Sequence, residues 1–166
     1  VMTANPVVYC EFVGTAYMAN PGTIFYWNGT TNWPTAGTVG SGTAITDLRA
    51  VGGYIVACLG ANKLLYSANG TAYTQSAGTL SEIDYITEIR GVAWGVGGTN
   101  KVYSTADVTG AWTLQGTVGD SLYGFTDIYN CQDFLLIGKQ DGFYSIDRDG
   151  AVYEVRDSGE INSTTV

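Results

Sequence analysis

The chain has 166 residues, of which 13 % are charged and 13 % aromatic, with 23 glycines and a formal net charge of −8. This composition is poor in the residues of solvated helices and rich in strand and turn formers. The basic residues form no cluster, which argues against nucleic-acid binding, because a phosphate backbone is held by grouped cations. No apolar run approaches the ~20 residues of a membrane-spanning helix, so we expect no membrane insertion.

Four related repeats of about 40 residues follow one another along the chain. Their turn glycines are Gly29, Gly70, Gly110 and Gly150, and the aromatic residues before these turns are Tyr26, Tyr66, Tyr103 and Tyr144. Chance is a poor explanation for two markers that keep one spacing. We place the repeats at about 1–43, 44–84, 85–123 and 124–158, which together form one domain at 1–158, followed by a polar tail at 159–166.

Each repeat is predicted to consist of short strands joined by tight turns. In the first repeat we expect strands at 7–12, 14–18 and 23–27, followed by a hairpin turn at Asn28-Gly29, because both residues tolerate positive φ. The expected strands of the second repeat are 45–51, 54–59, 64–67 and 71–74, and the central strands of the next two repeats are 92–96 and 134–137. No stretch has the apolar periodicity of an α-helix.

Strand repeats of about 40–45 residues are typical of propeller blades. A four-stranded sheet has two apolar faces, and neighbouring sheets around an axis bury both. We therefore predict an all-β fold, a β-propeller. Two arrangements fit four repeats: a closed four-bladed ring, or part of a larger propeller that other sequence or another copy completes. In a variant of the first, a strand from the tail completes the first blade.

The third strand and following turn of each repeat resemble the Asp-box (BNR-like) repeats of sialidase-type β-propellers, whose pattern is roughly Ser-x-Asp-x-Gly-x-x-Trp. The copies at 66–73, 103–112 and 144–153 keep most of these residue types, and the copy at 27–33 has lost the Ser. The matching residues are Ser67, Asn69, Gly70 and Tyr73 in the second repeat, Ser104, Asp107, Gly110 and Trp112 in the third, and Ser145, Asp147, Gly150 and Tyr153 in the fourth. In the family these boxes lie on outer hairpins, away from the catalytic face, so the resemblance implies a structural role, with Ser and Asp or Asn bonding turn amides.

The side chains offer little for catalysis. The chain has no His, which excludes Ser–His–Asp and Cys–His arrangements. Sialidases resemble one another in three arginines that grip the substrate carboxylate, whereas Arg49 and Arg90 take equivalent repeat positions here, which favours a structural or rim role. We predict that the protein is not an enzyme and has no catalytic or cofactor-binding residues.

Three acids, Asp47, Glu88 and Asp127, recur at one position of the repeat. If they converge near the axis, they form an oxygen-rich site of the kind that binds Ca²⁺. The competing interpretation, which we favour, is that each carboxylate bonds to backbone or faces solvent. Lysines also recur, among them Lys101 and Lys139, and we expect these at exposed turns.

The three cysteines, Cys10, Cys58 and Cys131, lie in apolar strand-like runs, where a thiol behaves as a small hydrophobe. An odd count cannot pair fully within one chain. If the repeats close a ring, Cys10 and Cys131 lie on adjoining blades, and a disulfide between them requires Cα atoms within ~7 Å. The sequence leaves the redox state of the cysteines open.

We expect a rigid, non-catalytic interaction module. The Gly/Thr/Tyr-rich, charge-poor composition is similar to that of propeller modules in phage virions and secreted surface proteins. We therefore expect a component of a virion (tail- or capsid-associated) or of a cell-surface assembly, with other protein subunits or further propeller blades as partners. One alternative is a lectin-like module in which Trp27, Trp33, Trp94 or Trp112 stacks on glycans. Another is a fragment of a glycosidase-type propeller.

Overall fold

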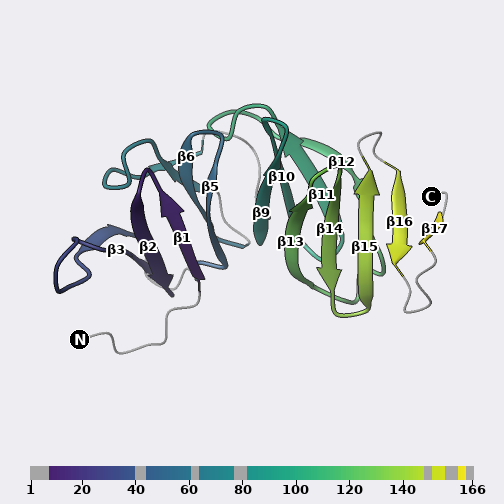
Figure 1. Ribbon diagram of the computed structural model, residues 1–166. Helices are drawn as coiled ribbons and strands as arrows, with labels where there is room; N and C mark the ends of the chain where they lie inside the picture. Colours follow the sequence, from purple (N-terminus) through teal and green to yellow (C-terminus); the bar gives the residue numbers. More distant parts are fainter. Residues whose placement is uncertain are drawn as a thin grey trace.

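The computed structural model describes residues 8–39, 44–60, 64–76, 82–147 and 151–155, together with the backbone of 161–163. Within these ranges the chain forms seventeen β-strands and no helix. The strands make four antiparallel sheets that follow one another in chain order as the four blades of a β-propeller (Figure 1). The predicted all-β propeller fold is confirmed. The described ranges contain no helix that is long and apolar enough to cross a membrane.

Each blade takes its strands consecutively from the chain, beginning with the strand nearest the axis. The first blade contains β1 (Val8–Phe12), β2 (Thr15–Asn20), β3 (Thr23–Tyr26) and β4 (Thr35–Thr38). The second contains β5 (Asp47–Val51), β6 (Tyr54–Cys58), β7 (Leu65–Ser67) and β8 (Thr74–Gln75). The third contains β9 (Tyr85–Ile89), β10 (Val92–Gly97), β11 (Lys101–Thr105) and β12 (Thr113–Thr117). The fourth contains β13 (Phe125–Cys131), β14 (Phe134–Lys139), β15 (Gly142–Asp147), β16 (Val152–Val155) and β17 (Ile161–Ser163).

Two strand expectations are wrong. The last strand of the second blade is predicted at 71–74, but β8 begins only at Thr74, because the backbone amides of Thr71 and Ala72 are tied to the Asn69 side chain in a turn. The tail at 159–166 does carry a strand, but this strand, β17, pairs with β16. It therefore extends the fourth blade and does not complete the first.

The first two strands of every blade are joined by a two-residue hairpin turn whose first residue has positive φ. Gly52 takes this position in the second blade, but Val13 (φ 48°), Arg90 (φ 54°) and Gln132 (φ 65°) take it in the others. In the first three blades the second turn residue is a glycine that also has positive φ, whereas Asp133 in the fourth blade does not. Positive φ at the first turn residue matches the twist of the flanking strands, which explains why this conformation persists where that residue is not glycine. Val13 is the most strained of the set, because a β-branched side chain crowds its own backbone in this region.

Val13→Asn is expected to raise the free energy of unfolding by about 1 kcal/mol, because Asn tolerates positive φ and would form an Asn-Gly hairpin turn with Gly14. The Val13 side chain is 85 % exposed, so its removal sacrifices no core packing. Urea unfolding followed by tryptophan fluorescence measures the effect. Val13→Ala serves as the control and should give a smaller gain, since Ala also disfavours positive φ. A stability equal to or below that of the unaltered chain would contradict the strain argument.

Three apolar cores hold consecutive blades together. The first joins blades one and two through residues that include Ala19, Ile24, Leu48 and Ile55. The second joins blades two and three through residues that include Val51, Val56, Ile86 and Ala93. The third joins blades three and four through residues that include Val96, Val102, Ile128 and Ile137. Full burial of one such aliphatic side chain stabilises the fold by about 1.5–3 kcal/mol, so each sheet depends on its neighbour.

The innermost strands pack in chain order, β1 on β5, β5 on β9 and β9 on β13. Among the described residues there is no comparable packing of β13 on β1, and no fourth core joins the fourth blade to the first. Figure 1 shows the first and fourth blades at opposite ends of the row of four blades. Both end faces of the row therefore lack the neighbouring blade that covers the equivalent face elsewhere.

Candidate functional site

The outer turn of the second blade is held by two polar side chains. Ser67 Oγ accepts a hydrogen bond from the Gly70 amide at 2.9 Å, and Asn69 Oδ1 accepts from the amides of Thr71 and Ala72 at 3.0 Å each. Gly70 has φ +75°, and a Cβ there would lie 1.9 Å from the hydroxyl oxygen of Tyr17 in the first blade. The turn thus needs glycine both for its backbone and for its close approach to the neighbouring blade.

The third blade builds the same turn with a different hydroxyl from the one that the sequence indicates. Thr105 Oγ1 accepts from the Asp107 amide at 3.1 Å and lies 2.9 Å from the Ala111 carbonyl, to which it can donate. Ser104, the residue that matches the Asp-box pattern, instead accepts from Gln115 Nε2 at 2.9 Å on the exposed side of the sheet. Thr105 pairs with Ala93 as Ser67 pairs with Ile55, so Thr105 is the equivalent of Ser67.

Thr105→Val is expected to lower the free energy of unfolding by about 1–2 kcal/mol, because it keeps the shape of the side chain but leaves the Asp107 amide without its acceptor. Ser104→Ala, one residue away, should change it by less than about 0.5 kcal/mol, since the Ser104 contact is exposed. Thermal and urea unfolding of the two variants show which of the two hydroxyls stabilises the turn. A larger effect at Ser104 than at Thr105 would restore the sequence-based assignment.

The remaining turn residues vary from blade to blade. Asp107 Oδ1 accepts from the Thr109 amide at 2.9 Å, and this hydrogen bond lowers the pKa of its carboxyl. Asp147 Oδ1 accepts from the Ala151 amide at 2.9 Å, and Asp147 Oδ2 accepts from the Tyr153 hydroxyl at 3.1 Å. Gly150 lies outside the described residues. The Gly110 amide donates a hydrogen bond to the Asp107 carbonyl at 3.1 Å. The half-buried side chains of Tyr73 and Trp112 pack against the first and second cores, respectively. Ser145 is buried.

Sequence reasoning missed one member of this set. Asn28 Oδ1 accepts from the Thr30 and Thr31 amides at 3.0 and 3.2 Å, as Asn69 does in the second blade. The signal was present, because Asn28-Gly29-Thr30 and Asn69-Gly70-Thr71 are the same triplet. The hairpin interpretation of Asn-Gly obscured it, since an Asx turn uses the side chain where a type I′ turn uses only the backbone.

Two of the three recurrent acids meet on the axis. Arg49 joins them: its Nε lies 3.0 Å from Asp47 Oδ1 and its Nη2 lies 3.1 Å from Asp127 Oδ1. Asp47 also accepts from the amides of Leu48 and Ile86, and the latter bond crosses from the second blade to the third. Burial raises the pKa of the Asp47 carboxyl, although Arg49 and the two amides oppose the shift.

Glu88 does not join this pair, so the expected single position for the three acids is wrong. Asp47 and Asp127 stand at the same place before their hairpin turns, and the residue at that place in the third blade is Tyr85. Glu88 lies near the hairpin end of β9, where its Oε2 accepts from the Gly52 amide at 2.6 Å. Among the described residues no group of three or more acidic, Cys or His side chains forms a cation site. The arrangement fits the interpretation in which each carboxylate bonds within the protein.

A cavity of about 410 Å³ lies at the axis and is lined by residues from the innermost strand of every blade or the segment leading into it, among them Tyr9, Arg49, Tyr85 and Asp127. Both acids in its wall are already bonded to Arg49. The Arg49 guanidinium also lies 5.8 Å from the ring centre of Tyr129, a cation–π distance. The cavity is therefore bordered by a connected network that links the second and fourth blades.

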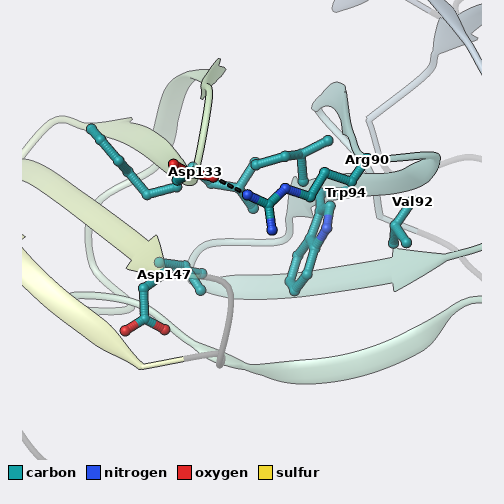
Figure 2. Close-up of a pocket in the computed structure, with 9 residues that line it drawn as sticks. Arg90, Val92, Trp94, Asp133 and Asp147 are labelled. Atoms are coloured by element: carbon teal, nitrogen blue, oxygen red, sulfur yellow. Dashed lines mark hydrogen bonds and ion pairs between the residues drawn. The ribbon is translucent and has the colours of Figure 1, made fainter.

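A second cavity, of about 270 Å³, opens between the third and fourth blades. Its walls come from the β9–β10 and β13–β14 hairpins and from the end of β15. Figure 2 shows Arg90 reaching across to Asp133, with the Trp94 ring beside the guanidinium and Asp147 on another part of the wall. An apolar floor with one aromatic face and a few charged groups at the rim is the usual composition of a small-ligand site.

All three cysteines are free. Cys10 points toward the second blade and packs half-buried against the first core, where burial raises the pKa of its thiol to about 12. Cys58 is buried in the second core, and burial raises its pKa well above the ordinary value. The disulfide considered between Cys10 and Cys131 is not formed.

The chain is similar to known proteins in fold alone. No protein-family model matches it, and a search of curated proteins finds no match. The computationally designed Ika4 protein shares 14 % identity and a TM-score of 0.60 over 99 % of this chain and 94 % of that one. The extracellular domain of a putative one-component system from B. thetaiotaomicron shares 13 % identity and a TM-score of 0.72 over 99 % of this chain and 24 % of that one. A streptogramin B lyase shares 12 % identity and a TM-score of 0.71 over 97 % and 55 %.

These structures differ in how much of their length the chain spans. It matches nearly the whole of the designed protein, but about a quarter of the extracellular domain and about half of the lyase. At such low identities the likeness carries no ligand or activity over to this chain. The structural likeness gives independent support for the propeller arrangement of the four blades.

Proposed function

We propose that the chain is a non-catalytic interaction module, a component of a virion (tail- or capsid-associated) or of a cell-surface assembly, that binds other protein subunits or further propeller blades. The observation that carries this proposal is the uncovered face of the fourth blade. We call it the fourth-blade flank and define it by the apolar residues on the face turned away from the third blade: Tyr129, Cys131, Phe134, Leu136, Phe143, Tyr153 and Val155.

The fourth-blade flank is continuous across four strands. Tyr129 pairs with Leu136 and Cys131 pairs with Phe134, so these side chains share one side of the sheet. Phe143 is 57 % exposed, Tyr129 47 % and Phe134 40 %. An exposed apolar patch of this kind is typical of a protein-interaction surface.

The axial residues support the non-catalytic part of the proposal. A glycosidase needs two carboxylates with different protonation states on either side of a substrate. Asp47 and Asp127 are instead bridged by one guanidinium. The outer-turn contacts of Ser67, Asn69 and Asp107 are of the local kind that the Asp-box resemblance implies. They support a relationship to sialidase-type propellers at the level of the blade.

Fractionation of the native source tests the location. An antibody against the chain should detect it in purified intact particles, or on whole cells where external protease removes the signal. A signal that remains in the soluble fraction of lysed cells and never sediments with particles or envelopes would contradict the proposed assembly role. The antibody is first shown to recognise the purified folded chain.

Glycan binding is the second candidate, and the cavity beside Trp94 is the observation that favours it. The ring offers a flat apolar face, and the exposed carboxylate of Asp133 can accept hydrogen bonds from sugar hydroxyls. A glycan array screened with the purified chain should give hits that Asp133→Asn weakens at least about tenfold in a follow-up titration. Glu11→Gln, an exposed acid on the first blade, is the matched control. An array without hits, or equal weakening by both variants, would reject the glycan site.

A further inference from the structure

The fourth-blade flank is equivalent to the face of the second blade that packs against the third blade. In the second blade this face carries Val51 and Val56, which are buried in the second core. Cys131 and Leu136 occupy the equivalent places in the fourth blade, counted from the hairpin turn. The surface therefore repeats an interface that is already formed elsewhere in the molecule, and it is built to receive the opposite face of another blade.

The first blade presents that opposite face. Its β1 turns Val8, Cys10 and Phe12 toward the second blade. Tyr9 alternates with them and points the other way, and it is 60 % exposed. Tyr9, Met18 and Phe25 are cross-strand partners and form one apolar row, which we call the first-blade flank. Met18 is already buried within the chain and Phe25 is half-buried, so Tyr9 is the exposed member of this row.

One molecule therefore carries two surfaces that could pack on each other as neighbouring blades do, but the two do not meet within the molecule. The described parts of β13 and β1 show no packing like that between other innermost strands. The first and fourth blades stand at opposite ends of the row in Figure 1. A second copy of the chain supplies the complementary half at each end.

We propose, as a specific form of the interaction module described above, that two copies of this chain associate head to tail, with the fourth-blade flank of each on the first-blade flank of the other. Such a contact joins two different surfaces, so a pair closes only when both contacts form together. Each contact buries apolar side chains of the same kind as the three inter-blade cores. The net charge of −8 on each chain opposes the association, so added salt should strengthen it.

Sedimentation velocity of the purified full chain over a range of concentrations tests the proposal. The unaltered chain should form a dimer that strengthens with salt. Phe143→Lys and Tyr9→Glu should each weaken dimerisation at least about tenfold, because each damages both contacts of a symmetric pair. Leu114→Lys, a change at an exposed apolar residue of the third blade that lies on neither flank, should leave dimerisation unchanged. Circular dichroism and thermal melting confirm that every variant folds.

Mixing the two weakened variants is the decisive experiment. A mixed pair keeps one intact contact, between the Tyr9 side of the Phe143→Lys chain and the Phe143 side of the Tyr9→Glu chain. Dimer should therefore reappear in the mixture at an affinity between those of the unaltered chain and the separate variants. If Tyr9→Glu alone still dimerises as well as the unaltered chain, the fourth-blade flanks meet each other and the head-to-tail proposal is wrong.

If the chain is monomeric at all concentrations and salt conditions, the proposal that a second copy covers the two flanks is also wrong. That result would leave the assembly role standing, because the fractionation experiment addresses location and does not depend on self-association. Conversely, the chain could dimerise in solution yet never sediment with particles or envelopes. That result would reject the proposed assembly role and support the head-to-tail dimer.

Discussion

Gly97→Ala is expected to prevent stable folding of the chain. Gly97 is the last residue of β10, and a Cβ at this position would lie 1.6 Å from the Glu82 carbonyl oxygen and 2.8 Å from the Ile83 Cα. These are backbone atoms of the segment that leads into the third blade, so no side-chain rotation relieves the clash. Ile83 beside them is fully buried in the second core. Overpacking of this severity costs about 3 kcal/mol or more, a large part of the stability of a domain of this size.

Urea unfolding and far-ultraviolet circular dichroism of the purified variant measure the loss. Gly124→Ala is the matched control: a Cβ there meets no atom within 4 Å, so its effect should stay within about 0.5 kcal/mol. A Gly97→Ala chain that unfolds at the same urea concentration as the control would show that the two segments do not approach as the structure places them.

The glycines illustrate what the sequence could and could not predict. The repeat spacing and the local turn chemistry were enough to predict four blades and most strands, because both depend on residues close together in the chain. Gly97 and Gly98 directly follow the predicted central strand at 92–96, and two adjacent glycines at that place indicate a turn. Gly98 does take positive φ, but Gly97 is required by a segment that crosses behind it. Local patterns cannot distinguish these two uses of glycine, since the second depends on where another part of the chain lies.

The candidate sites failed for a similar reason. Counting along the repeat aligned Glu88 with Asp47, but the second repeat is shorter than the count assumed, and the pairing of the strands puts Tyr85 at the position of Asp47 instead. Lys139 was expected at an exposed turn, yet it is buried and donates to the carbonyls of Thr99, Asp120 and Tyr123. A lysine among three carbonyl oxygens is stabilised by contacts from distant segments, for which the sequence holds no local signal.

The fourth-blade flank could be anticipated only in part. The question of whether four blades close a ring or need a further neighbour was visible in the repeat count. Its answer depends on the curvature set by the packing of β5, β9 and β13, which no single repeat encodes. Phe134 and Phe143 look like core residues in the sequence because the equivalent face is buried in the other blades.

Asp47→Ala is expected to lower the free energy of unfolding by about 2–4 kcal/mol at neutral pH. The change leaves the buried Ile86 amide without its acceptor and removes the nearer partner of the half-buried Arg49 guanidinium. Because the Ile86 bond joins the second blade to the third, the loss affects packing between blades as well as within one. Asp133→Ala is the control: its ion pair with Arg90 is exposed on both sides, so the cost should not exceed about 1 kcal/mol.

The pH dependence gives this prediction a second readout. The raised pKa of Asp47 means that, between the ordinary value of 3.8 and the higher folded-state pKa, the folded chain keeps a proton that the unfolded chain has released. The stability that this carboxyl contributes is therefore complete below pH 3.8 and declines as the pH rises through the folded-state pKa. The difference in unfolding free energy between the unaltered chain and Asp47→Ala should be larger at pH 4 than at pH 7. A difference that grows toward neutral pH would mean that Arg49 and the amides outweigh the cost of burying the charge, and would reverse the account of the axial network given above.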